Sequence, residues 1–172
     1  EHMLKMIEER PWLWATHVWN MFDFAADGRD EGGEHGLNQK GLVTLDRKQR
    51  KDAFYLYKAY WSRTPFIHLC GSRYTDRAEE VTEVKVYSNL PKVSLYVDGS
   101  VFAEQEGSRV FVFRVPITGE HSIECRGEGC SNVMLIRRAA EPNPEYCFNK
   151  KQEIVNWFDR EDYHPDCYSV MD

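Results

Sequence analysis

The pattern of apolar and polar positions changes near residue 66, and its two sides predict different kinds of structure. Residues 3–10 place apolar side chains at helical spacing before Pro11, which predicts a short helix. Residues 12–22, WLWATHVWNMF, are almost continuously apolar and aromatic, as in a strand that is covered on both faces within a parallel sheet. Such a helix and strand bury their apolar surface only against neighbouring elements.

A long polar segment follows, and then a second helical pattern. Residues 25–40 are rich in Gly, Asp and Glu and predict a loop, and loops of this length inside compact domains are usually functional. Residues 41–46, GLVTLD, predict a short extended piece. Residues 47–62 predict a helix that ends before Pro65. Its expected packing face consists of Phe54, Tyr57 and either Tyr60 or Trp61.

The next part of the chain consists of short alternating stretches that predict β-strands. These stretches are residues 82–89, 92–100, 108–117, 120–127 and 131–139. Asp98-Gly99 is a strong signal for a hairpin turn. Strands that recur about every ten residues with turns between them are typical of a small β-sandwich.

The pattern therefore predicts an α+β chain made of three parts. Residues 1–65 carry the helices and the two-sided strand, residues 66–140 form the sandwich, and residues 141–172 form a linker or tail towards a further domain. The tail begins with a Pro-rich linker and contains a possible short helix over residues 150–158.

Composition and charge exclude two classes of partner. The net charge is −6 at pH 7, whereas a nucleic-acid surface needs clustered Lys and Arg. The one basic run is interpreted as the solvated first turn of the helix over residues 47–62; it consists of Arg47, Lys48, Arg50 and Lys51. Since no apolar run approaches the roughly 18 residues of a membrane span, a membrane partner is not expected either.

The cysteines and histidines show no spacing that is typical of a metal site. The five cysteines are Cys70, Cys125, Cys130, Cys147 and Cys167. Their odd number and the absence of a C-x-x-C motif favour free thiols in a reducing compartment such as the bacterial cytoplasm, with a small Cys125–Cys130 bridge as the alternative. His17, His35 and His68 show no ligand spacing, so no metal is expected.

Three residues are candidates for binding chemistry. Trp19 lies near the end of the predicted strand, where an indole either stacks on the apolar face of a sugar ring or belongs to the core. Asn38 and Lys40 share a face if their stretch is extended, and an amide with an ammonium suits a carboxylate or a set of hydroxyls. The alternative for this pair is an ordinary polar loop.

An acidic cluster next to these residues raises the question of catalysis. It consists of Asp23, Asp27, Asp30, Glu31 and Glu34. Paired carboxylates serve as acid and nucleophile in glycosidases, but most of this cluster lies on a Gly-rich loop with nothing to bury it and tune a pKa. A solvated loop or a weak, nonspecific cation site is therefore the preferred interpretation, and no self-contained catalytic set is expected.

The order of motif pieces in VWNMFDFAADGRDEGG…GLNQKGLVTLDRKQRKDAFYLYKAYW resembles glycoside hydrolase family 2, the β-galactosidase and β-glucuronidase group. The match covers residues 1–65 and corresponds to the last strand, loop and helix of the family's TIM (β/α)8 barrel. Residues 66–140 resemble, more weakly, the immunoglobulin-like sandwich that follows the barrel in many members.

The resemblance implies a C-terminal part of a retaining β-glycosidase whose two catalytic glutamates lie upstream of Glu1. It implies that Trp19 lines the sugar subsite, and that Asn38 and Lys40 hold the sugar carboxylate of a β-glucuronide. Some relatives named β-galactosidase also carry N-x-KGLV, so both sugars stay open. The 172-residue chain alone is expected to be inactive. The expected partners are a carbohydrate substrate, the rest of the parent chain and further copies in a homo-oligomer.

Two other classes of function stay open at this stage. The sandwich is a binding module for carbohydrate or another ligand if aromatics such as Tyr87 or Tyr96 are exposed, or it is a purely structural or interaction domain. No cofactor is expected from the residues themselves. Flavin binding through C-terminal domains, which the resemblance suggests for some gut β-glucuronidases, is the additional alternative.

Overall fold

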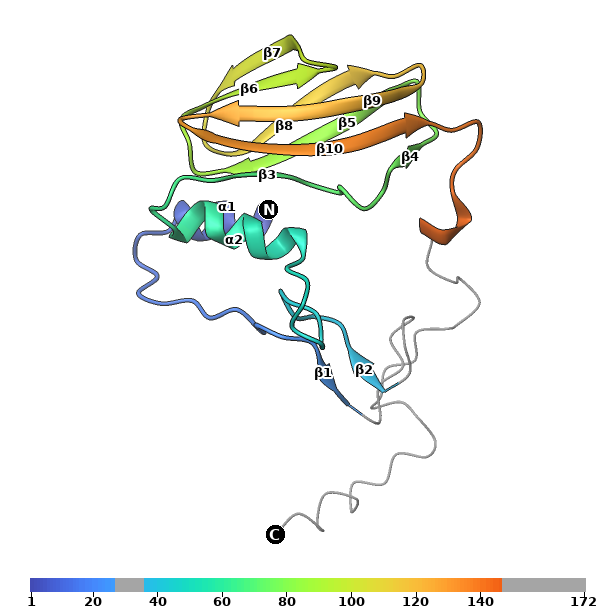
Figure 1. Ribbon diagram of the computed structural model, residues 1–172. Helices are drawn as coiled ribbons and strands as arrows, with labels where there is room; N and C mark the ends of the chain where they lie inside the picture. Colours follow the sequence, from blue (N-terminus) through green and yellow to red (C-terminus); the bar gives the residue numbers. More distant parts are fainter. Residues whose placement is uncertain (27–35, 147–172) are drawn as a thin grey trace. The chain divides into compact units, whose positions relative to one another are not determined.

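The computed structural model describes residues 1–26 and 36–146 (Figure 1). The expected helix over residues 150–158 and the loop acids from Asp27 to Glu34 lie outside the described residues. Contacts divide the described chain into two units, of which the first contains residues 1–18 and 50–146 and the second contains residues 19–26 and 36–49. The domain boundary near residue 66 stays a prediction, although the helix before it groups with the sandwich.

The first unit is built on two facing β-sheets, which confirms the predicted β-sandwich (Figure 1). The larger sheet has the strand order β4 (Asp76–Arg77), β10 (Cys130–Arg138), β9 (Glu120–Gly127), β6 (Lys92–Val97) and β7 (Ser100–Glu106). The smaller sheet has the order β3 (Ile67–Leu69), β5 (Val81–Ser88) and β8 (Arg109–Pro116). All pairings are antiparallel except the parallel pairing of β4 with β10.

The core of the sandwich follows from the alternation of apolar residues along its strands. Val93 and Leu95 on β6 are fully buried, and they face the other sheet together with Ile123 and Cys125 on β9. Val84, Val86, Phe111 and Phe113 form the matching side from β5 and β8. Because side chains alternate between the two faces of a strand, the intervening polar residues are left on the outside.

Two amide side chains join the sheets along their open edges. The Nε2 of Gln105 on β7 donates to the carbonyl oxygen of Val112 on β8 at 2.8 Å. On the opposite edge, the backbone N–H of Leu69 on β3 donates to Oδ1 of Asn132 on β10, also at 2.8 Å. One backbone group on each edge strand of the smaller sheet is therefore bonded to a side chain of the larger sheet.

The hairpin between β6 and β7 turns at Asp98-Gly99, as the sequence predicts. Both residues adopt the left-handed conformation, with φ of 50° and 79°. Two consecutive left-handed residues are the signature of the tight turn that matches the twist of paired strands. The Asp98 carboxylate also accepts hydrogen bonds from His121 Nδ1 at 2.7 Å and from the backbone N–H of Ser122 at 2.8 Å.

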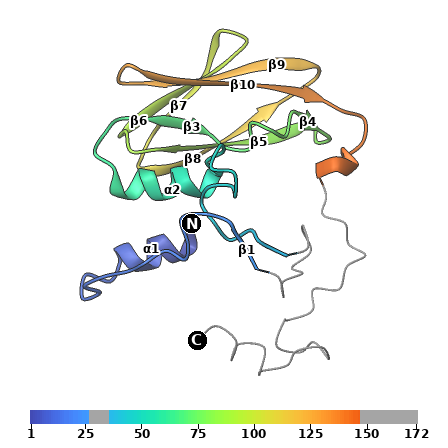
Figure 2. The same ribbon diagram turned by 60° about the horizontal axis from the view of Figure 1, so that its bottom comes forward.

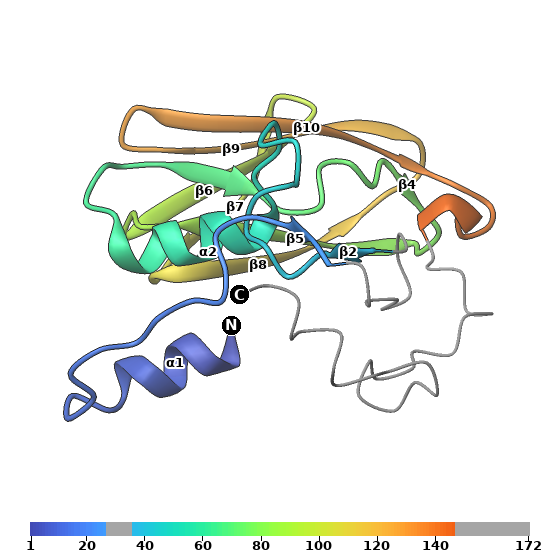
Figure 3. The same ribbon diagram turned by 90° about the horizontal axis from the view of Figure 1, so that it is seen from below.

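Two helices of the first unit pack on the outer face of the smaller sheet (Figures 2 and 3). They are α1 (His2–Glu8), which the sequence predicts, and α2 (Asp52–Trp61). Leu4 of α1, Leu56 of α2 and Tyr87 of β5 are the buried residues of this second apolar cluster. The prediction of an exposed Tyr87 is therefore wrong, since the side chain is buried and its hydroxyl donates to Glu1 at 2.6 Å.

The packing face predicted for the second helix is confirmed in part. Tyr57 and Tyr60 pack against the second apolar cluster, as expected. Leu56 and Ala59, which were not predicted, are the buried residues of the helix, while Trp61 is 59% exposed and is not part of the packing face.

The basic run is not the first turn of this helix, which corrects the sequence-based interpretation. Arg47 adopts a left-handed φ of 65°, and the backbone of Thr44 is hydrogen-bonded to Gln49 across the turn. Lys51 is extended, with ψ of 163°, and the helix begins only at Asp52. A turn that uses a left-handed residue cannot continue as a helix, so the basic run precedes α2 in the sequence and is not part of it.

The prediction of a strand over residues 12–22 is also wrong. Residues 12–21 form no strand, and Phe22 makes only an isolated parallel bridge with Val43. A strand requires hydrogen-bonding neighbours, and none lies beside residues 12–18 within the described parts of the chain. The indoles of Trp12 and Trp14 are accordingly 73% and 96% exposed.

The last described residues return to the sandwich. The short helix η1 (Pro144–Tyr146) places the Tyr146 hydroxyl where it accepts the backbone N–H groups of Thr75 and Asp76 at 3.1 and 3.3 Å. Among residues 1–26 and 36–146, no helix has both the length and the apolar character needed to cross a membrane.

Candidate functional site

The three residues singled out in the sequence all lie in the second unit, which is built from two paired segments. Strand β1 (Phe24–Ala25) is antiparallel to β2 (Leu37–Asn38), with Phe24 opposite Asn38. Further along, the backbone N–H of Val43 donates to Met21 O, and that of Asp23 donates to Val43 O, at 3.0 and 2.9 Å. The predicted extended piece over residues 41–46 is therefore paired at Val43.

Gly41 is the residue that allows these two segments to lie so close together. A Cβ atom at this position would stand 2.0 Å from the backbone nitrogen of Asp23 and 2.2 Å from the carbonyl carbon of Phe22. No side chain fits there, so only glycine permits the pairing. Sequence reasoning missed this role, although the glycine directly follows the Asn-x-Lys triplet and was therefore in view.

Asp23 fixes the same junction from the opposite side. Its side chain is buried, and its Oδ1 accepts the backbone N–H of Gly41 at 2.8 Å. The sequence placed Asp23 in an acidic cluster that belongs mostly to a solvated loop. The structure gives Asp23 an anchoring position between the two segments.

Asn38 is fully buried, whereas Lys40 is exposed. The Oδ1 of Asn38 accepts the backbone N–H of Lys40 at 3.0 Å, which fixes the orientation of the amide. Within the part of the chain that the structure describes, the Nδ2 of Asn38 has no hydrogen-bond partner. Leaving a buried donor unsatisfied costs about 1–3 kcal/mol, so this amide stands out as a group that an added acceptor would stabilise.

Trp19 is connected to Asn38 through Phe24, which contacts the indole and pairs with Asn38 across the strands. Its ring meets that of Phe24 edge-to-face with 6.3 Å between centroids, and Phe24 is the cross-strand partner of Asn38. The indole is 75% exposed, so the interpretation of Trp19 as a core residue does not hold for the described chain. The structure thus gathers an exposed indole and the Asn-x-Lys stretch on one small assembly.

Arg47 completes the surroundings of Trp19 and was not predicted from the sequence. Its guanidinium lies 4.0 Å from the centroid of the Phe22 ring and donates to the carbonyl oxygens of Asp23 and Leu45. Residues 19–24 and Arg47 line a shallow hollow of about 370 Å³. We refer to Trp19, Asn38, Lys40 and this hollow together as the indole–amide site.

The chemistry of the indole–amide site is that of binding. An exposed indole offers an apolar face, Lys40 offers a positive charge, and Asn38 offers a directional amide. The described residues here include no nucleophile paired with a base, because the one buried carboxylate, Asp23, is engaged with the backbone of Gly41. The arrangement can hold an anionic polar ligand and can orient it.

The exposed face of the sandwich offers a weaker alternative. Tyr96 is half-buried, and the Arg126 guanidinium lies 4.2 Å from its ring centroid. Arg126 is in turn held by two hydrogen bonds to the Glu124 carboxylate. An aromatic face that is already covered by a neutralised arginine is poorly suited to stack on a sugar.

Comparison with known proteins identifies the relatives of the chain, although no family model matches it. Over 103 residues the chain is 47% identical to a β-glucuronidase of Bacteroides fragilis, which covers 59% of this chain and 15% of that protein. The chain is a homologue of β-glucuronidases. It spans less than a quarter of the length of these relatives.

Solved structures agree with this assignment. An FMN-binding β-glucuronidase from Facaelibacterium prausnitzii L2-6 is 44% identical, with a TM-score of 0.81 over 84% of this chain and 23% of that one. A Bacteroides fragilis protein provisionally named β-galactosidase is 32% identical, with a TM-score of 0.77 over the same shares. The predicted resemblance to the β-galactosidase and β-glucuronidase group is therefore confirmed.

Proposed function

We propose that this β-glucuronidase homologue is part of a retaining β-glycosidase that hydrolyses terminal β-glycosides, with β-glucuronides as the preferred substrates. Residues 1–65 then contribute the last β/α unit of a TIM barrel, and residues 66–140 an immunoglobulin-like sandwich. The catalytic glutamates belong to other parts of the larger protein. The identities of 47% and 44% to proteins named β-glucuronidase support this assignment.

The observation that carries the proposal is the strand pairing that sets Phe24, which contacts the exposed Trp19 ring, opposite Asn38, whose amide oxygen accepts the backbone N–H of Lys40. In the proposed complex the indole of Trp19 stacks on the sugar ring, while the exposed Lys40 binds the sugar carboxylate and the buried Asn38 orients it through Lys40. The hydrogen bond from the backbone N–H of Lys40 to Oδ1 of Asn38 supports this role, because it fixes the backbone that carries the ammonium. A galactoside has no carboxylate for the Lys40 ammonium, and for this reason glucuronides are preferred.

The decisive experiment is Lys40→Ala in the full-length protein that contains this sequence. Charge-assisted hydrogen bonds contribute about 1.5–3 kcal/mol, which corresponds to a loss of about 10- to 150-fold in kcat/KM. We expect this loss for a nitrophenyl β-glucuronide and a change of less than about threefold for the matching β-galactoside.

Lys48→Ala is the matched control, because Lys48 is a lysine of the same unit whose side chain is 81% exposed and pairs with Asp46. It should leave both substrates unchanged. Equal kinetics of Lys40→Ala and the unaltered enzyme on the glucuronide would refute the assigned role. That result would favour a chain that has no contact with sugar.

The 172-residue chain alone is proposed to be inactive, since its described residues hold no catalytic pair. Purified chain should release no nitrophenol from either glycoside above the uncatalysed rate. Measurable turnover that co-purifies with the chain would contradict the proposal that the catalytic glutamates lie elsewhere.

The free thiols of Cys70, Cys125 and Cys130 support a reducing compartment, and we place the parent in the bacterial cytoplasm on that ground.

A second candidate function is flavin mononucleotide binding. It is favoured by the 44% identity over 84% of the chain to a protein named as FMN-binding. Titration of the purified chain into FMN should quench flavin fluorescence if the candidate is correct. Riboflavin, which lacks the phosphate, is the control, and a flat titration with both leaves the sandwich a structural domain.

A further inference from the structure

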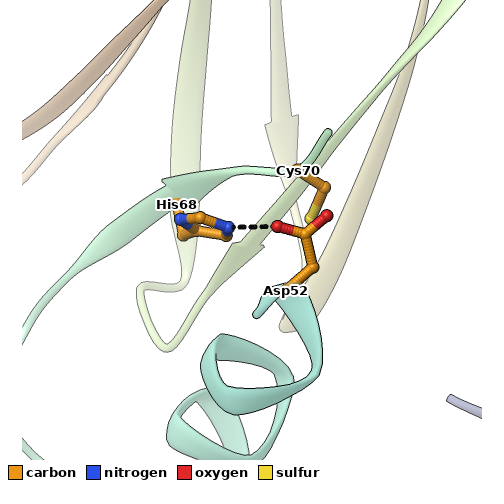
Figure 4. A group of neighbouring side chains, drawn as sticks. All are labelled: Asp52, His68 and Cys70. Atoms are coloured by element: carbon orange, nitrogen blue, oxygen red, sulfur yellow. Dashed lines mark hydrogen bonds and ion pairs between the residues drawn. The ribbon is translucent and has the colours of Figure 1, made fainter. Parts of the chain in front are cut away.

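Three side chains that can bind a metal ion meet where α2 begins, and none of them belongs to the indole–amide site. Asp52 is the first residue of α2, His68 lies in the middle of β3, and Cys70 follows that strand (Figure 4). Their donor atoms all lie within 4.8 Å of one another. Since Asp52 and His68 are sixteen positions apart, no ligand spacing announced this cluster in the sequence.

The geometry of the cluster is close to that of a zinc site. Zinc binds imidazole nitrogen and carboxylate oxygen at about 2.0–2.2 Å and thiolate sulfur at about 2.3 Å, which places tetrahedral ligand atoms about 3.3–3.7 Å apart. His68 Nε2 and Asp52 Oδ1 are 2.8 Å apart, so the ion requires only a small separation of these two side chains. Figure 4 shows the imidazole directed at one oxygen of the Asp52 carboxylate and the side chain of Cys70 drawn beside the same carboxylate.

Neighbouring groups hold two of the three ligands in place before any ion arrives. The His68 ring stacks on Tyr55 with 3.7 Å between centroids and an interplanar angle of 8°. The Oδ2 of Asp52 accepts the backbone N–H of Gly71 at 2.8 Å, which leaves Oδ1 directed at the imidazole. Supporting contacts of this kind orient metal ligands and strengthen binding.

The charge balance favours a divalent ion over a monovalent one. A carboxylate and a thiolate together neutralise a 2+ ion, and the positive charges of Arg73 and Lys85 favour the ionised forms of Asp52 and Cys70 respectively. The opposing cost lies at Cys70, where burial and then the charge of Asp52 raise the pKa of the thiol to about 12. Binding must therefore release the thiol proton, as coordination by zinc commonly does.

We propose that Asp52, His68 and Cys70 form a site for a divalent transition metal of the zinc class, with one coordination position left to water. The mixed oxygen, nitrogen and sulfur donors suit zinc and cobalt and do not suit calcium or magnesium, which take oxygen ligands. The side chain of Asp52 is 44% exposed, which gives water access to the fourth position. The bound ion joins the start of α2 to β3, so its effect is on the docking of this helix, and it is independent of the sugar chemistry.

Cobalt titration of the reduced, metal-free 172-residue chain tests this proposal. One equivalent of Co²⁺ should produce a thiolate-to-cobalt charge-transfer band together with the visible bands of tetrahedral coordination. Cys70→Ser should abolish the charge-transfer band, and His68→Gln and Asp52→Asn should each weaken binding by at least about 100-fold. Cys130→Ser is the matched control, because Cys130 is also a half-buried free thiol, and it should leave the titration unchanged.

A measurement on the unaltered chain keeps the proposal falsifiable if a variant fails to fold. Alkylation of each cysteine, mapped by mass spectrometry, should slow at least tenfold at Cys70 when Zn²⁺ is present and should be unchanged at Cys130. Equal alkylation of Cys70 with and without zinc would overturn the proposal. A cobalt band that survives in Cys70→Ser, or that ignores His68→Gln and Asp52→Asn, would overturn it as well.

Discussion

Asn38 and Lys40 illustrate what a residue type reveals in a sequence and what it conceals. The chemistry of the two side chains was recognisable, but they were expected to lie on the same face only if the stretch were extended. The strand ends at Asn38, whose amide turns back to the N–H of Lys40, so one side chain is buried and the other is exposed. Gly41 was harder to predict, because its importance depends on a backbone segment eighteen residues away.

At this scale we expect Gly41→Ala to disrupt the pairing of residues 19–25 with residues 36–43. The added Cβ would overlap the backbone of Phe22 and Asp23, and overpacking in a tight site costs typically about 1–3 kcal/mol or more. Hydrogen–deuterium exchange at the amides of Asp23 and Val43 should accelerate by at least about tenfold. Gly119→Ala, where an added Cβ meets no atom within 4 Å, is the control and should leave exchange unchanged.

The hairpin residue Asp98 gives a pH dependence with a defined sign. The hydrogen bond from His121, and then that from Ser122, hold the pKa of Asp98 below the ordinary value of 3.8. The folded state therefore gains stability from this carboxylate above about pH 3.8, and the gain is lost as pH falls through the lowered folded-state pKa. The interaction depends on Nδ1–H of His121, since Nε2 accepts the N–H of Thr118 at 3.2 Å.

Melting temperatures of the chain and of Asp98→Asn between about pH 2 and 6 measure this effect. Their difference should be largest near the upper end of this range and should shrink below pH 3.8 as the carboxylate becomes protonated. A difference that stays constant throughout would show that Asp98 acts only through the shape of its turn.

At the scale of elements, most strands of the sandwich were predictable and the helix face was predictable only in part. Alternation along a strand reports burial directly, so β5, β6, β8, β9 and β10 correspond to the expected stretches, whereas β7 was not among them. In α2 the expected Tyr57 and Tyr60 do pack against the apolar cluster, but the buried residues Leu56 and Ala59 were missed. The expected strand over residues 12–22 failed because a two-sided strand is defined by neighbours that the local sequence cannot supply.

Leu56→Ala tests whether α2 is an integral part of the first unit. Leu56 is 7% exposed in a cluster with Leu4 and Tyr87, and replacement of a buried leucine by alanine costs about 2–5 kcal/mol. Urea denaturation followed by far-ultraviolet circular dichroism should show a loss of this size. Leu135→Ala on the exposed face of β10, where the side chain is 54% exposed, should change stability by less than about 0.5 kcal/mol. Equal small effects would mean that the helix is only loosely attached.

At the scale of the whole molecule, the exposed indoles support the proposal that this chain works within a larger protein. Each indole carries about 150–250 Å² of surface, and soluble proteins rarely leave large contiguous apolar patches in water. Trp12 and Trp14 are almost adjacent in the sequence and are both mainly exposed. The sequence predicted the need for covering surfaces, and the described residues do not provide them for these two side chains.

We therefore expect the purified chain to self-associate with increasing concentration. Substitution of both Trp12 and Trp14 by serine should lower the weight-average mass in sedimentation experiments towards that of the monomer. Val133→Ser with Leu135→Ser, at two side chains of β10 that are 55% and 54% exposed, should have a smaller effect because aliphatic side chains bury less area. A monomeric chain at all concentrations would remove this support for missing partner surfaces.

The hydrogen bonds made by Gln105 and Asn132 have a consequence for the slow aggregation of the sandwich. Strand edges with unpaired backbone groups recruit strands from other molecules and seed fibrils, and here each amide engages one such group on an edge strand of the smaller sheet. Loss of either amide would leave the native fold nearly intact and yet expose an unpaired strand edge to a second molecule of the same chain. Such variants would aggregate on storage even where their melting temperature is nearly unchanged.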